Sequence, residues 1–206
     1  MNYFITGIGT NVGKTIVSAV LTEALQADYW KPVQSGTIEG FDSLTVKSLI
    51  TNSTSVFHPE AYLLKQPLSP HSAAKIEGVE IALQQIQLPK TTNHLIIEGA
   101  GGLLVPINET HFVIDMARHF HSEIILVLTD YLGCINHSLL SIDYLLRNQF
   151  NIHVLVFNGT FNEEVKRTII AHAPGIKTLS VNTLQTLSKE EILAEAGKLR
   201  AQLKGL

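Results

Sequence analysis

A glycine-rich segment near the start of the chain has the residues needed to hold phosphate. Residues 6–15 read TGIGTNVGKT, between an apolar run and a stretch with helical periodicity. Glycines let the backbone curl so that its N–H groups point at phosphate oxygens, and the positive end of a following helix adds to the attraction. In such a loop Lys14 reaches the β- and γ-phosphates and Thr15 holds Mg²⁺. The residues expected to contact the nucleotide here are Gly9, Thr10, Asn11, Val12, Gly13, Lys14 and Thr15.

The spacing of this loop leaves an alternative open. The usual pattern has four residues between its first glycine and Gly-Lys-Ser/Thr, whereas five separate Gly7 from Gly13. A glycine-rich turn in another α/β protein would also fit that spacing, but the Gly-Lys-Thr triplet in this context favours phosphate binding. A dinucleotide site of the Rossmann type fits less well, because the second apolar run ends in KPV at residues 31–33 and not in an acidic residue.

Polar residues follow two further apolar runs. Residues 31–36, KPVQSG, place the ammonium group of Lys31 and the hydroxyl of Ser35 at the end of one run, although a solvated lysine before an ordinary turn is the commoner arrangement. Residues 98–102, EGAGG, place Glu98 at the end of another, which is typical of a magnesium-binding carboxylate next to a phosphate. The contacts expected there are Glu98, Gly99, Ala100 and Gly101.

Three other positions could contribute to a site. Asp42 opens a helical pattern, so it is either an N-cap or a carboxylate that reaches Mg²⁺ together with Thr15 and Glu98. Residues 132–137, LGCINH, open another helix, whose N–H groups could bind a carboxylate or phosphate. Cys134 and the nearby histidine lack a second pair of ligands, which disfavours a metal site, and a lone cysteine is more often buried than nucleophilic. Asn158 ends the fifth apolar run, where a base-reading residue often lies.

These residues need a parallel sheet to bring them together. Near-continuous apolar runs at 3–6, 29–33, 95–98, 124–128 and 153–157 predict strands buried on both faces, and helical stripes at 17–25 and 135–146 lie between them. A capping-box pattern at 188–191 predicts a final helix up to 203. This alternation indicates an α/β fold, with a mainly parallel sheet flanked by helices on both faces, in which ligands bind at the carboxyl ends of the strands. We expect residues 1–206 to form one domain, with a long functional loop over 51–70.

Composition narrows the class of partner. A formal net charge of −3 argues against a nucleic acid or an anionic membrane as the main partner. The N-terminus lacks the features of a signal peptide, and no apolar run reaches the ~18 residues of a membrane span. The single cysteine cannot form an intrachain disulfide, which fits a reducing compartment. The expected location is therefore the cytoplasm.

Taken together, five motifs resemble the dethiobiotin synthetase family. They occur in the family's order, span about residues 1–160, and include the longer loop, which is the family's own form. They are TGIGTNVGKT at 6–15, YWKPVQSG at 29–36, SPH at 69–71, IEGAGG at 97–102 and LGCINH at 132–137. The SPH motif is expected to be a turn with a possible ligand contact. The resemblance implies an ATP- and Mg²⁺-dependent P-loop enzyme that joins CO₂ to 7,8-diaminononanoate through a carbamate and a carbamic-phosphoric anhydride. The second amine then closes the ureido ring and expels phosphate.

The resemblance also implies residue roles. Lys14, Lys31 and Thr10 would act in catalysis, with the two lysines offsetting the repulsion between an anionic carbamate and the triphosphate, and Ser35 would bind the diamine or carbamate. Asn158 would recognise adenine. The substrate's distant carboxylate would bind to the partner subunit of a homodimer, at Gly133, Cys134, Ile135 and Asn136. The chain departs from the family at Asn11, often acidic in relatives, and after residue 170, where the Ile-Pro-Trp-Leu stretch near the base is missing.

Two rival functions remain within the P-loop class. A cobyrinic-acid-type amide synthase usually carries an amidotransferase domain, for which 206 residues leave no room. A nucleotide-switched ATPase of the partitioning type, acting as a binding module, carries an extra lysine early in the loop, and residues 7–12 contain none. ATP turnover that requires the diamine would separate the synthetase from this second rival.

Overall fold

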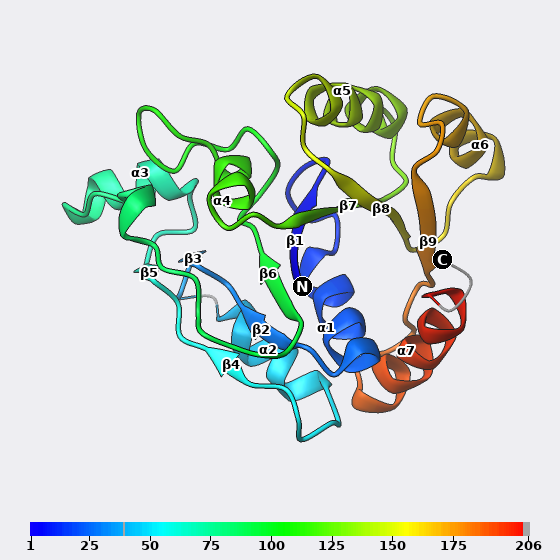
Figure 1. The fold of residues 1–206 in the computed structure, drawn as a ribbon, viewed down its shortest axis with the longest axis horizontal. Coiled ribbons are helices and arrows are strands. Elements are labelled where there is room, and N and C mark those ends of the chain that lie inside the picture. Colours follow the sequence, from blue (N-terminus) through cyan, green and yellow to red (C-terminus); the bar gives the residue numbers. More distant parts are fainter. Residues whose placement is uncertain (39, 204–206) are drawn as a thin grey trace.

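The computed structural model describes residues 1–38 and 40–203, and within them a parallel sheet of seven strands forms the centre of the molecule (Figure 1). The strand order is β4-β2-β6-β1-β7-β8-β9, and every pairing is parallel. The bounds are β1 Asn2–Gly7, β2 Asp28–Trp30, β4 Phe57–His58, β6 Leu95–Glu98, β7 Glu123–Leu128, β8 Ile152–Asn158 and β9 Lys177–Val181. The predicted α/β fold with a parallel sheet is confirmed.

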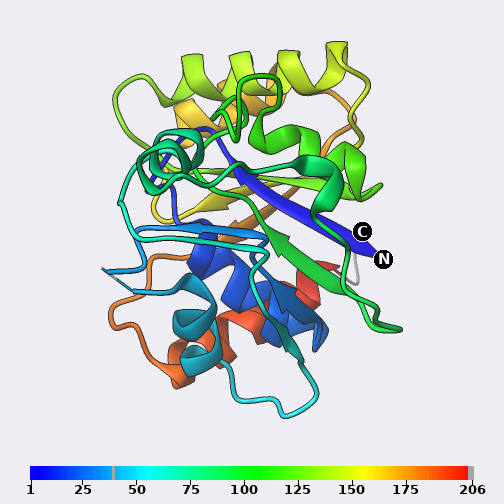
Figure 2. The same cartoon turned by 90° about the vertical axis from the view of Figure 1, so that its left-hand side faces the viewer.

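Helices cover both faces of the sheet, as Figures 1 and 2 show. One layer contains α1 Lys14–Leu25, α2 Asp42–Leu49 and α7 Lys189–Leu203; the other contains α3 Pro70–Glu77, α4 Val113–His119, α5 Cys134–Arg147 and α6 Glu163–Ala171. A short 3₁₀ turn lies at Leu83–Gln85. The central strands are therefore almost wholly buried, which is why they are apolar without alternation. No helix within these described residues is long and apolar enough to cross a membrane.

The second predicted strand is wrong in its extent. Residues 29–33 do not form one strand: β2 ends at Trp30, and the chain passes through Lys31 and Pro32 into β3 Val33–Ser35, which pairs with β5 Tyr62–Leu64 in a separate small sheet. Proline has no N–H to donate to a sheet ladder, so a strand tends to stop there. The break leaves Lys31 at the end of the main sheet.

The segment 51–70, expected to be a long loop, contains β4 and β5 and leads into α3. The SPH motif within it is not a free turn, because Ser69 is the N-cap of α3 and Pro70 is its first residue. Proline is favoured at that position because the missing N–H has no helical partner there in any case. Four elements, α3, α4, α6 and β9, were not predicted from the sequence.

The long C-terminal helix packs on α1. α7 begins after Ser188, whose hydroxyl accepts a hydrogen bond from Glu191 N at 3.3 Å, so half of the predicted capping box is present. The other half is not, because the Glu191 carboxylate accepts hydrogen bonds from Gln185 N and Thr186 N instead. Further along α7, Arg200 donates to the backbone oxygens of the last turn of α1, at 2.7 Å each, and so caps that helix.

A buried carboxylate fixes the start of β2. Asp28 accepts hydrogen bonds from Val56 N at 3.0 Å, Thr91 Oγ1 at 2.7 Å and Asn93 Nδ2 at 3.3 Å, and it contacts His58 at 3.3 Å. Burial opposes its charge, but these donors outweigh burial and lower the pKa of Asp28. One side chain therefore ties the segments that lead into β4 and β6 to the start of β2.

We expect Asp28→Asn to lower the free energy of unfolding at neutral pH by about 1–3 kcal/mol, because an amide cannot accept all these hydrogen bonds. A carboxyl whose folded-state pKa is depressed stabilises the fold above its ordinary pKa of about 4, and this stabilisation is lost as the pH falls through the folded-state value. Urea unfolding from pH 7 to pH 3 measures both effects. The deficit of the variant should shrink on acidification; a constant deficit would contradict the role of the charge.

Candidate active site

The register of the sheet brings three distant segments to one edge. Ile5 of β1 lies opposite Glu98 of β6, and Trp30 of β2 lies opposite Ile97. The glycine-rich loop, Glu98 and Lys31 therefore leave neighbouring strands at the same carboxyl end. This is the edge at which parallel sheets bind ligands.

The glycine-rich loop has the backbone shape of a phosphate-binding loop. Asn11 and Gly13 have φ values of 60° and 88°, in the left-handed region, and α1 begins directly after Gly13. A Cβ atom at Gly13 would lie 2.0 Å from the Asn158 side-chain nitrogen, which donates to Val12 O at 3.0 Å. Glycine is thus required at position 13 both for conformation and for space.

Lys14 lies along the loop, and its Nζ donates to Gly9 O at 3.0 Å. The pKa of Lys14 is lowered from its ordinary value to about 8: burial is the largest cause and the charge of Lys31 adds to it, while the carboxylates of Glu98 and Asp42 act in the opposite direction. Burial destabilises the charged form of Lys14, and a polyphosphate placed beside it would stabilise that form.

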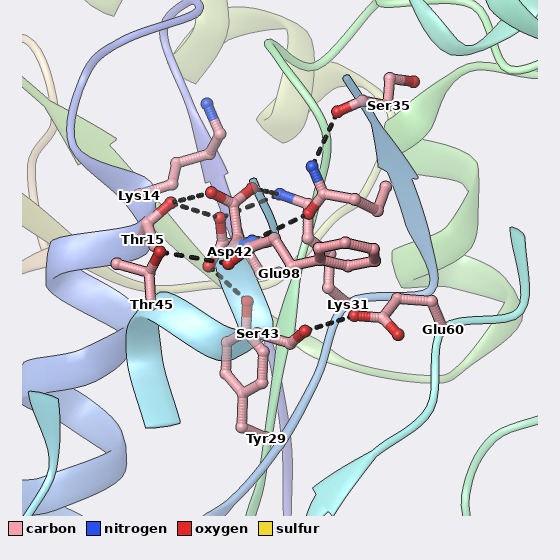
Figure 3. Close-up of polar contacts among 12 residues, drawn as sticks. Lys14, Thr15, Tyr29, Lys31, Ser35, Asp42, Ser43, Thr45, Glu60 and Glu98 are labelled. Atoms are coloured by element: carbon pink, nitrogen blue, oxygen red, sulfur yellow. Dashed lines mark hydrogen bonds and ion pairs between the residues drawn. The ribbon is translucent and has the colours of Figure 1, made fainter. Parts of the chain in front are cut away.

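Next to the loop, four charged or polar side chains meet (Figure 3). Thr15 Oγ1 donates to Glu98 Oε1 at 2.9 Å and to Asp42 Oδ1 at 3.2 Å. Lys31 Nζ donates to Glu98 Oε1 at 3.1 Å and pairs closely with Asp42 Oδ2. Carboxylate and hydroxyl oxygens are the donors that Mg²⁺ prefers, so this group could hold the ion beside a bound triphosphate.

Lys31 is held charged within this group. It is only 4% exposed, and burial by itself disfavours the ammonium form. The carboxylates of Glu98 and Asp42 outweigh burial and raise the pKa of Lys31. The interpretation of Lys31 as a solvated surface lysine, which the sequence left open, is therefore wrong.

Asp42 is not the N-cap of its helix. Phe41 occupies that position, and Asp42 is the first residue of α2. Its backbone N–H, which has no helical partner, donates to Gln34 Oε1 at 3.1 Å, so its carboxylate remains free to face Thr15 and Lys31.

A cleft of about 900 Å³ opens over this group. Ser35 Oγ is buried and has no hydrogen-bond partner among the described residues. A buried hydroxyl without a partner is costly, so a ligand that supplied one would be stabilised. The predicted site residues that line the cleft are Thr10, Asn11, Gly13, Lys14, Thr15, Lys31, Ser35, Asp42, Glu98, Ala100 and Gly101.

Other predicted residues lie outside this cleft. Val12 and Gly99 are buried and do not line it, and the carbonyl of Gly9 accepts the hydrogen bond from Lys14. Asn158 lies behind the loop. The segment Gly133, Cys134, Ile135 and Asn136 is at the start of α5, on the other face of the sheet from α1 and α2 (Figure 1), and does not line the cleft.

Cys134 lacks the properties of a nucleophile. Its side chain is buried, and burial and the neighbouring Asp130 carboxylate raise the pKa of the thiol. A reactive cysteine needs a lowered pKa.

Sequence reasoning missed two side chains that support the site, Tyr29 and Gln34. The Tyr29 hydroxyl donates to Glu98 Oε2 at 2.9 Å, and Gln34 holds the backbone of Asp42. The signal for Tyr29 was strand alternation, because residues 29 and 31 face the same side of an extended chain. Gln34 gave no signal, since its partner lies across an irregular turn.

The sheet, the loop and the converging charges define a P-loop nucleotide-binding protein. The chain matches the AAA domain family over residues 1–198. It is 53% identical to the ATP-dependent dethiobiotin synthetase of Cytophaga hutchinsonii over 198 residues, covering 96% of each chain. It is 42% identical to that of Lawsonia intracellularis over 195 residues, covering 91% of this chain and 94% of the relative. The chain belongs to the dethiobiotin synthetase family.

Solved structures with the same fold are distant in sequence. The cell division ATPase MinD of Pyrococcus furiosus has a TM-score of 0.60 at 11% identity, covering 99% of this chain and 98% of its own. A putative plasmid partition protein of Borrelia burgdorferi bound to AMPPNP has a TM-score of 0.58 at 12% identity, and the match covers 100% of this chain and 98% of that protein. At such identities the likeness concerns the fold alone.

We expect Gly13→Ala to weaken ADP binding by roughly five- to thirtyfold, because a left-handed alanine costs about 1–2 kcal/mol and about 1.4 kcal/mol corresponds to a tenfold change. Calorimetric titration with ADP measures the loss. Gly197→Ala is the matched control: a Cβ there meets nothing within 4 Å, and alanine favours the helix. Equal ADP affinity in both variants would contradict the requirement at position 13.

Proposed function

We propose that the chain catalyses ATP-dependent formation of dethiobiotin in biotin biosynthesis. It joins CO₂ to 7,8-diaminononanoate, closes the ureido ring and releases ADP and phosphate. Support comes from the relatives, which bear the name of this enzyme, and above all from one observation: Lys31 lies in the same cleft as the phosphate loop, held by Asp42 and Glu98. We assign residues 1–206 to one catalytic domain that acts in the cytoplasm.

The charges in the cleft suit this reaction. A carbamate is an anion, and its attack on the γ-phosphate brings two negative groups together. Lys14 lies on the loop side of the cleft and Lys31 across from it. We assign both as catalytic residues that offset the repulsion and stabilise the charge as it moves to the leaving phosphate. Thr10, at the mouth of the loop, is assigned to the same γ-phosphate region.

The oxygen donors fit a magnesium ion. Thr15 Oγ1 and one oxygen from each of Asp42 and Glu98 come from three different elements and meet at hydrogen-bond distance. Mg²⁺ usually takes one or two carboxylates and completes its shell with phosphate and water. Bound here, the ion would neutralise charge on the β- and γ-phosphates. The three side chains would hold it against the loop.

In this proposal Ser35 binds the carbamate or diamine, and Asn158 binds the adenine of ATP. The unpartnered hydroxyl of Ser35 would donate to the carbamate or accept from the diamine. Asn158, whose nitrogen is bound to Val12 O, would offer its carbonyl oxygen to the exocyclic amine of adenine.

We further infer a homodimer in which the partner completes the substrate site. The family resemblance assigns the distant substrate carboxylate to the segment from Gly133 to Asn136, which lies outside the cleft of its own chain. Backbone N–H groups at the start of α5 suit a carboxylate. Large apolar side chains are exposed beside this segment and across the neighbouring surface: Tyr131, Leu132, Leu140 and Leu104. A second copy would bury them.

The test of this function is direct. The protein is incubated with diaminononanoate, bicarbonate, ATP and Mg²⁺, and dethiobiotin and ADP are measured. Dethiobiotin should form in proportion to ADP, and ADP release should require the diamine. ATP turnover that ignores the diamine would support the partitioning-type alternative and refute the synthetase assignment.

We expect Lys31→Ala to reduce ring formation by at least about a hundredfold, the usual cost of removing one group that stabilises transition-state charge. ADP binding should remain measurable, because the phosphate loop is unchanged. Thermal unfolding is recorded as well, since the variant leaves Glu98 without its buried cation. Lys75→Ala, an exposed lysine on α3, is the control. Equal loss of ring formation and of ADP binding would show that Lys31 supports the loop and not the reaction.

The shared site predicts complementation between two inactive variants. Lys31→Ala inactivates the cleft of its own chain. Asn136→Asp repels the carboxylate of the substrate that occupies the partner's cleft. A heterodimer of the two contains one intact site, so an equal mixture after subunit exchange should regain roughly a quarter of wild-type dethiobiotin formation. No recovery, with exchange verified by mass spectrometry, would refute the shared site.

A further inference from the structure

A buried phenol lies directly behind Glu98. Tyr29 is 0% exposed and does not line the cleft, yet its hydroxyl donates to Glu98 Oε2 at 2.9 Å. Its ring packs against Phe57, with the centroids 5.5 Å apart. Figure 3 shows the phenol reaching the acidic group from the side opposite the loop. Tyr29 is not among the residues assigned above to bind the nucleotide, the magnesium ion or the substrate.

The sheet explains how Tyr29 reaches Glu98. Tyr29 lies opposite Ile96 in the register of β2 and β6, so Glu98 is its diagonal neighbour on the same face. Aromatic side chains are long enough to bridge such a diagonal. Tyr29 on β2 therefore approaches Glu98 from inside the protein, and Lys31, just after the same strand, approaches it at the cleft.

The hydrogen bonds divide the two oxygens of Glu98. Within the described part of the chain, Oε1 accepts from Thr15 and Lys31, and Oε2 accepts from Tyr29. Because Glu98 is only 1% exposed, water cannot readily replace a lost donor. The phenol thus fixes the rotation of the carboxylate and leaves one oxygen for the cleft.

Packing alone does not account for a tyrosine here. A phenylalanine would fill the same space against Phe57 without bringing a polar group into the core. The hydroxyl of Tyr29 instead donates to Glu98 Oε2 at 2.9 Å, and both groups are buried. The tyrosine provides what a phenylalanine cannot, a fixed donor to an inner carboxylate.

We propose that Tyr29 is a positioning residue, whose hydroxyl orients Glu98 so that Oε1 faces Thr15 and thereby sets the magnesium affinity of the nucleotide site. The proposal rests on the proposed function, in which Glu98 is a magnesium ligand. Replacing a group that orients a metal ligand from behind typically costs roughly 10- to 100-fold in metal affinity or activity.

The test compares Tyr29→Phe with the wild-type protein by calorimetric titration of MgCl₂ into protein saturated with ADP. The apparent magnesium affinity should fall by about tenfold, at the lower end of the effect of such partners. ADP binding without magnesium should be unchanged, because the loop keeps its contacts. In the dethiobiotin assay, two fold-changes are compared. The magnesium concentration that gives the half-maximal rate should rise by a larger factor than the rate at saturating magnesium falls.

A double-mutant cycle with Glu98→Gln separates positioning from general weakening of the fold. If Tyr29 acts through Glu98, Tyr29→Phe should have no further effect on magnesium affinity once Glu98 is replaced. Tyr62→Phe is the control, because Tyr62 also uses its hydroxyl within the protein, to accept from Ala82 N at 3.2 Å. It should leave magnesium affinity unchanged.

The outcomes distinguish this proposal from the proposed function. Unchanged magnesium affinity in Tyr29→Phe, with a loss in Glu98→Gln, overturns the role of Tyr29 and leaves the function intact. Unchanged affinity in both variants overturns the magnesium assignment of Glu98 as well. If Tyr29→Phe is unstable, the shift of its thermal midpoint by ADP with and without MgCl₂ gives the same comparison, because a ligand stabilises the fold according to its affinity.

Discussion

A carboxylate buried at the end of a central strand is the constraint around which the site is organised. Glu98 is almost wholly enclosed, and an isolated charge in such a place would cost several kcal/mol. It is tolerated because three donors reach it: Thr15 on α1, Tyr29 on β2 and Lys31 just after β2. The same contacts that stabilise the charge bring the phosphate loop and the second lysine together, so stability and function depend on one group.

Sequence patterns predicted the centre of the fold and most of the cleft. The strand before the loop, the loop itself and α1 were foreseen because a buried parallel strand is continuously apolar and a glycine-rich turn follows it. Glu98 was foreseen because a carboxylate that ends a buried strand lies at the ligand-binding edge of the sheet, whereas Lys31 received its role through the family resemblance. The strongest predictions thus concern residues whose position follows both from the local sequence pattern and from the geometry of a parallel sheet.

The missed features depend on contacts that no local pattern encodes. Proline stopped β2 and sent the chain into a second sheet, although the apolar character of residues 29–33 continued across the break. For Asp42 the sequence left two roles open, an N-cap and a magnesium ligand, because the contact of its backbone N–H with Gln34 lies across an irregular turn. α4 and β9 are short and lack a strong period, so their form is decided by packing. The segment from Gly133 to Asn136 was assigned through resemblance, and the cleft of a single chain leaves it outside.

The strand order also bears on how the chain acquires its structure during synthesis. β1 leaves the ribosome first, but its neighbours are β6 and β7: Asn2 pairs with Leu95 and Tyr3 with Glu123. The phosphate loop is therefore made early and held in place late, after half of the polypeptide has emerged. Contacts between residues so distant in sequence form slowly, and an apolar strand without neighbours is prone to aggregate. Nascent chains that stall before β7 would expose β1, which makes them natural clients for chaperones.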